Sequence, residues 1–183
     1  LDPGTVTEKV EGAHTTEQVF GLEAIWIGED QREDAEQKGY TVVEAPAVLA
    51  THLMETLKRY AHEILSRQDT QTLLDNVKKE NATLVEELVP SAMSVGSIQK
   101  VLQNLLRERV PIRDLFTILE SLSDYASQTK DLGALTEYVR QNLSRTIYNL
   151  YKDNEGKVTA ITLAPEVERT IAEVIQNSVT KGT

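Results

Sequence analysis

The feature that most limits what this chain can fold into is a pair of apolar stripes at helical spacing on either side of Pro111. In each stripe the apolar side chains recur at steps of three and four residues, which places them on one face of an α-helix. Proline cannot continue a helix, because it lacks a backbone N–H and its ring collides with the preceding turn. The sequence therefore predicts an αα-hairpin, with Ser97 capping its first helix and its second helix starting at Ile112. The stripes consist of Ile98, Val101, Leu102, Leu105 and Leu106, and of Leu115, Phe116, Leu119 and Leu122.

Further helical patterns flank this pair. Pro46 suits the first turn of a helix, and the apolar residues after it predict one helix that reaches Arg67 with one face in the core. Asp69 is expected to cap the next helix, and residues 135–151 are expected to form another. A last amphipathic helix is predicted to start at Pro165.

Three short segments are predicted to be strands, because they are rich in β-branched and aromatic residues and are bounded by turn residues. Residues 29–38 are acidic and polar, which predicts a short solvated helix between the first two strands. Residues 20–44 then make a strand–helix–strand crossover, and residues 1–19 are predicted to be a loop. The predicted strands are residues 22–27, 40–43 and 158–163.

Together these patterns predict an α+β fold that is predominantly helical. A small α/β subdomain comes first, a bundle-like helical subdomain lies in the middle, and a strand and a helix end the chain. A solitary strand leaves its ladder groups unpaired. We therefore expect the last part to be the start of a truncated C-terminal α/β subdomain.

The acidic balance of the chain limits its partners. Lys and Arg number 19 against 29 Asp and Glu, a formal net charge of −10. Such a surface repels nucleic-acid and anionic lipid phosphates over about 8 Å at physiological salt, so nucleic acid is not an expected partner. The chain contains no cysteine, which excludes disulfides, thiolate nucleophiles and cysteine-type zinc sites.

No membrane span is expected either, since the sequence has no run of about 18 apolar residues. The chain opens LDPGTV, without an initiating Met and without a signal peptide. We therefore expect it to be a piece of a longer protein.

The histidines do not form a metal site in the sequence pattern. His62 and Glu63 begin a motif close to HExxH on the helix that follows Pro46, but the second histidine is replaced by Ser66. His52 lies about 15 Å away along the helix, too far to share a metal ion. Phosphate-binding, dinucleotide-binding and hydrolase motifs are also missing from the sequence. The sequence predicts no catalytic residue, metal ligand or cofactor, and does not indicate an enzyme.

Two residues have ambiguous environments. Phe20 lies in a glycine-flanked loop just before a predicted strand, where an aromatic side chain either fills the core or lines an exposed binding surface. Thr51 lies off the main apolar stripe of its helix, so it is neither clearly buried nor clearly solvated. The residues alone leave these alternatives open.

Long segments of the chain resemble the cytoplasmic part of the FlhA and SctV family, the large integral-membrane component of the type III secretion export gate. The resemblance runs along almost the whole chain, VLQNLLRERVPIRDL being its most specific part, and it favours the flagellar branch over the virulence branch. The matching segments are LDPG (1–4), FGLEAIWI (20–27), REDAEQKGYTVVEAPAVLATHL (32–53), LVEELVP (84–90) and VLQNLLRERVPIRDLFTILESLSD (101–124).

The resemblance implies a membrane protein whose N-terminal half, missing from this chain, spans the bacterial inner membrane. Its C-terminal half would form a nonameric homo-oligomeric ring on the cytoplasmic face of that membrane. Residues 1–44 would be much of the second of four subdomains, and 45–64 a connecting helix that belongs to the preceding subdomain. Residues 65–144 would be the helical third subdomain, and 145–183 the start of the truncated fourth.

The resemblance also implies a binding site. In the flagellar branch, export chaperones carrying their substrates dock in a hydrophobic dimple formed by an acidic residue, a phenylalanine three positions on, and the threonine of an ATHL motif. These positions are Glu17, Phe20 and Thr51. The family usually has Asp at the first position, so Glu17 departs from the pattern.

The predicted function is therefore a non-enzymatic docking platform of the flagellar type III export apparatus. Its expected partners are export chaperone–substrate complexes and other export components, including the ATPase complex. The alternative is a mainly structural part that builds the ring of a virulence-type (injectisome) export gate.

Overall fold

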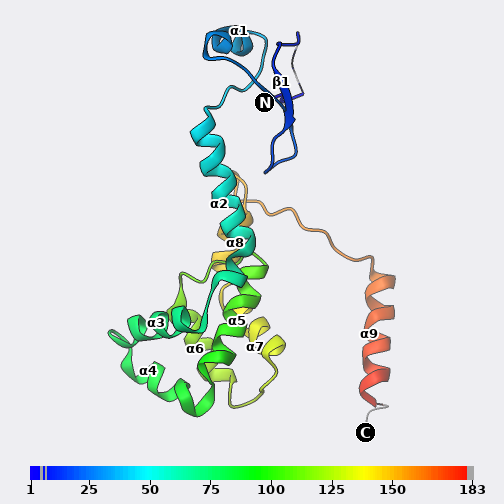
Figure 1. Ribbon diagram of the computed structural model, residues 1–183. Helices are drawn as coiled ribbons and strands as arrows, with labels where there is room; N and C mark the ends of the chain where they lie inside the picture. The colour runs from blue at the N-terminus through cyan, green and yellow to red at the C-terminus, as the bar shows by residue number, and fades with distance from the viewer. Residues whose placement is uncertain (5, 7, 181–183) are drawn as a thin grey trace. The chain divides into compact units, whose positions relative to one another are not determined.

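The computed structural model describes residues 1–4, 6 and 8–180, with side chains described up to residue 176. The chain divides into two compact units, Leu1–Gln141 and Asn142–Thr183 (Figure 1). Both are mainly helical, and the larger unit also contains a two-stranded sheet. The predicted α+β, predominantly helical fold class is confirmed.

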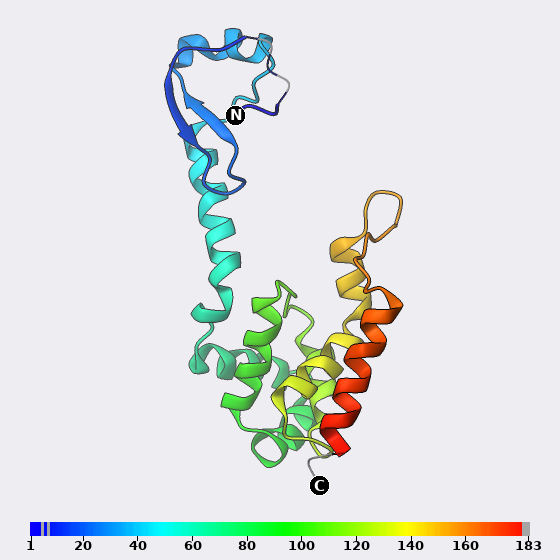
Figure 2. The same cartoon turned by 90° about the vertical axis from the view of Figure 1, so that its right-hand side faces the viewer.

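The sheet is a β-hairpin at the start of the larger unit. Strand β1 (Ala13–Thr16) pairs antiparallel with β2 (Glu23–Trp26), with Ala13 opposite Trp26 (Figure 2). The short helix η1 (Glu29–Gln31) follows and runs directly into α1 (Arg32–Gln37), as the acidic sequence predicts. The predicted loop over residues 1–19 is wrong at β1. The β1 sequence AHTT shows no alternation of apolar and polar residues, and all four residues are exposed.

The predicted strand over residues 40–43 is also wrong. This segment belongs to no strand ladder in the described chain, and its one strand-like exchange is at Thr41, whose N–H donates to the carbonyl of Leu1 at 3.0 Å. The crossover expected for residues 20–44 is therefore a hairpin, a helix and an extended connection. β-Branched residues favour extended backbone, but a strand needs a partner along its whole length.

Helix α2 (Ala45–Ile64) follows the connection and has Pro46 in its first turn, as predicted. The expectation that one of its faces is core is wrong, because none of its residues, all of which are described, is buried. Its apolar stripe stays at least 44% exposed at every large residue from Leu49 to Ile64. The residues of this exposed stripe are Leu49, Leu53, Met54, Leu57, Tyr60 and Ile64.

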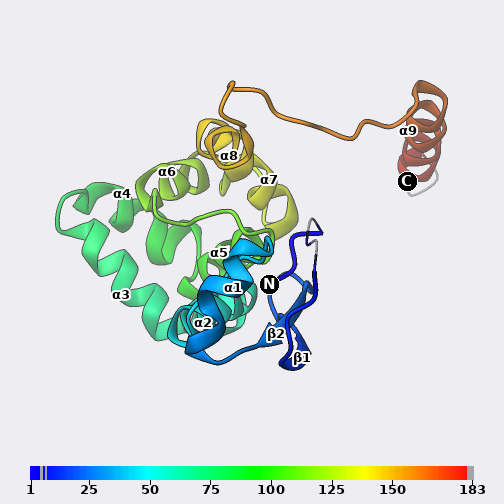
Figure 3. The ribbon, with the colours of Figure 1, turned by 90° about the horizontal axis from the view of Figure 1, so that it is seen from above.

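The remaining helices of the larger unit enclose its core (Figure 3). They are α3 (Arg67–Lys78), α4 (Ala82–Glu87), η2 (Leu88–Ala92), α5 (Val95–Arg107), α6 (Leu115–Tyr125) and α7 (Leu132–Asn142). Helix α5 packs against α2 and α3, and α4 packs against α3 and α6. The stripe predicted on α5 is confirmed as core at four of its five residues, since Ile98, Val101, Leu102 and Leu105 have no exposed surface. Leu106, the fifth, is half-buried.

Three of these helices begin at a residue other than the expected one. The cap of α5 is Ser94, whose hydroxyl accepts the N–H of the predicted cap Ser97 at 3.1 Å. The cap of α3 is Ser66, three residues before the predicted Asp69. Helix α6 starts at Leu115 with Asp114 as its cap, and not at residue 112. Serine and aspartate are similarly good N-cap residues, so the sequence alone does not show which of several neighbouring ones caps the helix.

The Ser66–Asp69 capping box gives the stability of the larger unit a pH dependence. The Asp69 carboxylate accepts hydrogen bonds from the hydroxyl and the backbone N–H of Ser66, which hold the Asp69 pKa below its ordinary value of 3.8. A group whose pKa is lower in the folded state stabilises the fold above its unfolded pKa. The contribution is lost as the pH falls through the folded pKa.

We therefore expect Asp69→Asn to be less stable than the wild type at pH 7, and the difference to shrink as the pH falls below about 4. Urea unfolding of both proteins from pH 7 to pH 3 measures this difference. A gap that does not change with pH would show that the charge of Asp69 contributes nothing.

The junction between α2 and α3 is fixed by side chains of α5. Leu65 is the C-cap of α2, and its carbonyl accepts hydrogen bonds from the side-chain amides of Gln99 at 2.9 Å and Gln103 at 3.2 Å. A carbonyl at a helix end has no partner within its helix, so these amides supply one. A second link joins Glu55 of α2 to Arg109 after α5, at 3.6 Å.

The smaller unit holds α8 (Ser144–Tyr151) and α9 (Pro165–Thr180). The single helix predicted for residues 135–151 is wrong, because α7 ends at Asn142 and α8 starts at Ser144. The predicted strand over residues 158–163 is also wrong: the segment is described, forms no strand and is exposed, Ile161 completely. The smaller unit thus has no strand in its described residues. In the described part of the chain, no helix is both long and apolar enough to cross a membrane.

Candidate functional site

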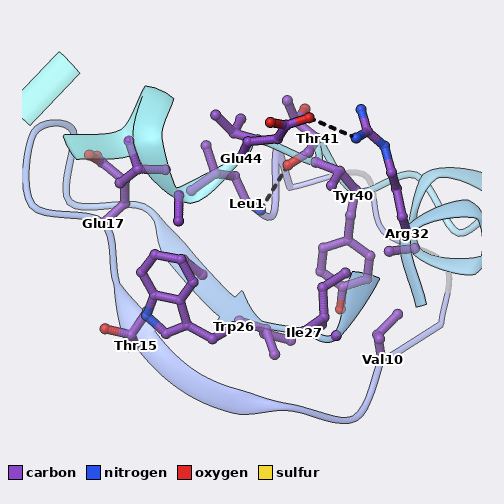
Figure 4. Close-up of a pocket in the computed structure, with 18 of the residues that line it drawn as sticks. Leu1, Val10, Thr15, Glu17, Trp26, Ile27, Arg32, Tyr40, Thr41 and Glu44 are labelled. Atoms are coloured by element: carbon purple, nitrogen blue, oxygen red, sulfur yellow. Dashed lines mark hydrogen bonds and ion pairs between the residues drawn. The ribbon is translucent and has the colours of Figure 1, made fainter. Parts of the chain in front are cut away.

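A cavity of about 540 Å³ lies in the first part of the larger unit. Its walls come from the β-hairpin, α1, the extended connection before α2, and the first turns of α2 (Figure 4). Its volume falls in the range of protein sites that enclose small molecules. The wall is mainly apolar, with Val10, Trp26, Ile27, Tyr40 and Val48 among its residues.

Polar groups lie at the edges of this cavity. The guanidinium of Arg32 pairs with the carboxylate of Glu44 at 3.1 Å, which ties α1 to the residue before α2. Glu17 from the hairpin and His52 from α2 also line the cavity. A pocket with an apolar wall and a few convergent polar groups is the usual anatomy of a binding site.

Glu17 is the only one of the three predicted binding residues that lines the cavity. Glu17 is only 8% exposed, although its side chain ends in a carboxylate. One carboxylate oxygen accepts the N–H of Val19 at 3.0 Å, and the other accepts the N–H of Phe20 at 2.6 Å. Hydrogen bonds from backbone N–H groups offset the cost of burying a charged group. The carboxylate therefore stabilises the backbone of the hairpin loop that contains it.

Phe20 lies in that loop and is 68% exposed. Of the two environments that the sequence leaves open for it, the structure excludes the core. Gly21, the next residue, has a φ of +70°, a conformation that side chains with a Cβ adopt only at a cost in energy. The glycine lets the chain turn back into β2 directly after the aromatic residue.

Thr51 lies on α2, half-buried, directly before His52. Val48, one turn before it, and His52 both line the cavity beside Glu17, but Thr51 does not. The structure thus brings Glu17 and the first two turns of α2 to one cavity. It leaves Phe20 and Thr51 outside the wall, and their role in binding stays a prediction.

Sequence reasoning missed the aromatic residues of the cavity. Trp26 is the only tryptophan of the chain, and Tyr40 follows Gly39 at the end of the turn after α1. Both line the cavity (Figure 4). The available signal was the position of both aromatic residues at the ends of apolar or β-branched runs that are bounded by glycines, Gly28 after Trp26 and Gly39 before Tyr40.

The histidine motif is not continuous in the structure. Helix α2 ends at Ile64 and Ser66 caps α3, so the predicted placement of residues 62–66 on one helix is wrong. Among the described side chains, His62 has only the neighbouring Glu63 within ion-pair distance, at 3.6 Å. Among the described residues, no three His, Cys, Asp or Glu side chains group closely enough to hold a metal ion.

Comparisons with known proteins agree on one family. The model of the FHIPEP family matches residues 1–183. The flagellar biosynthesis protein FlhA of Bacillus subtilis (strain 168) is 42% identical over 178 residues, which are 97% of this chain and 26% of that protein. The chain therefore spans about a quarter of the length of this curated relative.

Two solved structures are also similar to this chain. The Chlamydia pneumoniae CdsV protein superposes with a TM-score of 0.74 and 28% identity, covering 87% of this chain and 46% of that chain. The complex of the Chlamydia pneumoniae CdsV and CdsO proteins gives a TM-score of 0.73 and 27% identity, covering 82% of this chain and 44% of that chain.

Proposed function

The chain belongs to the FHIPEP family, and from this we propose that it is a non-enzymatic docking part of a flagellar type III export gate. In this proposal the hairpin loop and the start of α2 bind export chaperones that carry their substrates. The protein acts at the cytoplasmic face of the inner membrane. The 42% identity to FlhA of Bacillus subtilis supports the flagellar branch.

The observation that carries the proposal is the position of Phe20. A phenylalanine ring that is 68% exposed, on a loop whose base opens into an apolar cavity, is an anchor without a partner in the described chain. Aromatic anchors that become buried beside apolar pockets dominate the energy of protein–protein interfaces. The exposed ring therefore suits a partner that supplies a complementary apolar surface.

The proposal includes further partners of the assembled gate. CdsV of Chlamydia pneumoniae, to which the chain is similar, has been solved in a complex with the CdsO protein. This supports a gate that binds other export components besides chaperones. Assembly into a ring through residues 65–144 is the second candidate function, and the test below separates it from docking.

Phe20→Ala is expected to weaken the binding of a filament-type chaperone–substrate complex by about 30-fold. The basis is the loss of about 2 kcal/mol typical of an aromatic hot spot. Isothermal titration calorimetry measures the affinity for the full chain. The matched control is Phe116→Ala, because Phe116 is the second of the two phenylalanines and is 40% exposed on α6.

An affinity that does not change in Phe20→Ala, or that falls equally in Phe116→Ala, would refute docking at the hairpin. Sedimentation velocity on the same samples gives the oligomeric state. If the hairpin is a docking site, both variants are expected to have the same oligomeric state as the wild type. If the protein serves ring assembly alone, the chaperone complex binds neither variant differently from the wild type.

A further inference from the structure

The loop that joins β1 to β2 is organised by one residue. Both carboxylate oxygens of Glu17 accept backbone N–H groups of the loop, from Val19 at 3.0 Å and Phe20 at 2.6 Å. The backbone of Glu17 closes the loop as well, since its N–H donates to Leu22 at 2.8 Å and its carbonyl accepts from Gly21 at 3.0 Å. Every hydrogen-bonding group of Glu17 is therefore engaged within residues 17–22.

This arrangement fixes the backbone at the residue that carries the aromatic ring. The hydrogen bond from the Phe20 N–H is short and ends on a charged acceptor, which makes it stronger than a bond between neutral groups. Gly21, at a φ of +70°, supplies the turn that follows. The peptide of Phe20 is held on both sides, while its side chain stays exposed.

Little of Glu17 remains for a partner to touch. The residue is 8% exposed, and its carboxylate already has an N–H donor on each oxygen. An acid that recognised a partner by charge would lie on the exposed rim of the interface, where its carboxylate meets the incoming donor.

We propose that Glu17 is a positioning residue, which braces the hairpin loop so that Phe20 is presented in its binding conformation, and does not itself contact the partner. This inference rests on the proposed docking function for its effect on affinity, but the brace itself is a property of the free chain. A preformed loop binds more tightly than a mobile one, because less conformational entropy is lost on binding.

The same hydrogen bonds explain why Glu17 can replace the Asp that the family usually has at this position. A short acidic side chain commonly accepts the N–H groups two and three residues ahead of it, which is the geometry of an Asx-turn. Glu17 makes the same bonds with one more methylene group. An Asp at position 17 is therefore expected to brace the loop as well, whereas an Ala cannot.

The first experiment measures the brace without any partner. Amide hydrogen exchange by NMR on the full chain is expected to be about tenfold faster at Val19 and Phe20 in Glu17→Ala, because each amide loses a bond to a charged group. In Glu17→Asp both amides are expected to exchange within about twofold of the wild-type rate. The control is Glu23→Ala, which removes an equal charge from β2 and leaves the brace intact.

The second experiment measures the effect on docking with the filament-type chaperone–substrate complex. Glu17→Ala is expected to bind about tenfold more weakly, and Glu17→Asp within about twofold of the wild type. The double variant Glu17→Ala/Phe20→Ala is expected to bind no more weakly than Phe20→Ala. Once the ring is gone, its position no longer matters, so the two losses do not add.

Losses that add in the double variant would overturn the positioning role, because they would mean that Glu17 contacts the partner by itself. Wild-type exchange rates at Val19 and Phe20 in Glu17→Ala would also overturn it. Circular dichroism melting identifies a variant that fails to fold. If Glu17→Ala does not fold, the exchange rates at Val19 and Phe20 in Glu17→Asp are compared with the wild type instead, and rates that differ by much more than twofold would overturn the positioning role. If Phe20→Ala leaves the affinity unchanged, the docking function fails, while the exchange rates still decide whether the brace exists.

Discussion

Leu105→Ala is expected to lower the free energy of unfolding of the larger unit by about 2–5 kcal/mol. Leu105 lies in the middle of the α5 stripe and has no exposed surface. Its helix packs against α2 and α3, so the removed atoms leave a cavity that close-packed neighbours fill only in part. The loss combines the lost transfer energy of the side chain with the energy of that cavity.

Urea unfolding of both proteins, followed by circular dichroism, measures this loss. The matched control is Leu53→Ala, the same substitution in α2 at a side chain that is 57% exposed. An exposed helical leucine buries little surface, so the control is expected to change stability by less than about 0.5 kcal/mol. Equal losses in the two variants would contradict the assignment of the core to the α5 stripe.

Gly12→Ala is expected to destabilise the β-hairpin by about 1–3 kcal/mol, the usual penalty for forcing a methyl group into a packed site. A Cβ at residue 12 would lie 2.3 Å from the carbonyl oxygen of Trp26 and 2.6 Å from the side chain of Ile25. Both distances are well below contact distance, and the carbonyl belongs to β2 backbone that cannot rotate away. The strand has to shift, and with it Trp26 and Ile25, which line the cavity.

The fluorescence of Trp26 gives a local measurement, because it is the only tryptophan of the chain and is 50% exposed. Its emission in Gly12→Ala is expected to differ from the wild type in the native state, and its urea midpoint to be lower. The control is Gly133→Ala in α7, where the nearest atom to the added methyl group is a side-chain oxygen of Asp131 at 3.1 Å. Unchanged Trp26 emission and stability in Gly12→Ala would contradict the close approach of residue 12 to β2.

The helical core could be predicted from the sequence because its signal is local. The spacing of the α5 stripe requires one helix face to be buried wherever the helix lies, and Ile98 and Leu102 are fully buried. The same spacing is present in α2, whose Leu53 and Leu57 are 57% and 50% exposed. Periodicity identifies the apolar face of a helix but does not show whether another element of the chain covers that face.

The strands were harder to predict because pairing is not local. β1 has exposed side chains throughout and was missed, while residues 40–43 and 158–163 have strand-like composition but no ladder. A strand is defined by its hydrogen-bonding partner, which no single segment encodes.

The candidate site was predictable only in part. The resemblance to the family supplied Glu17, Phe20 and Thr51, and the structure excludes a core position for Phe20. No sequence pattern indicated that the Glu17 carboxylate bonds to the loop, because that depends on how the hairpin folds back on itself. The cavity beside it also could not be predicted, since its wall depends on how four consecutive elements pack against one another and not on the sequence of any one of them.

Helix α2 is held at its C-terminal end, so a rotation about that end moves its N-terminal end. Its 20 residues span about 30 Å at about 1.5 Å per residue. Gln99 and Gln103 of α5 hold the carbonyl at its far end, while Val48 and His52 near its start form part of the cavity wall. A rotation of about 10° around the held end moves the other end by about 5 Å, from the helix length alone. If α2 follows α5 as one rigid body, a reorientation of α5 by that angle would displace the cavity end of α2 by the same distance.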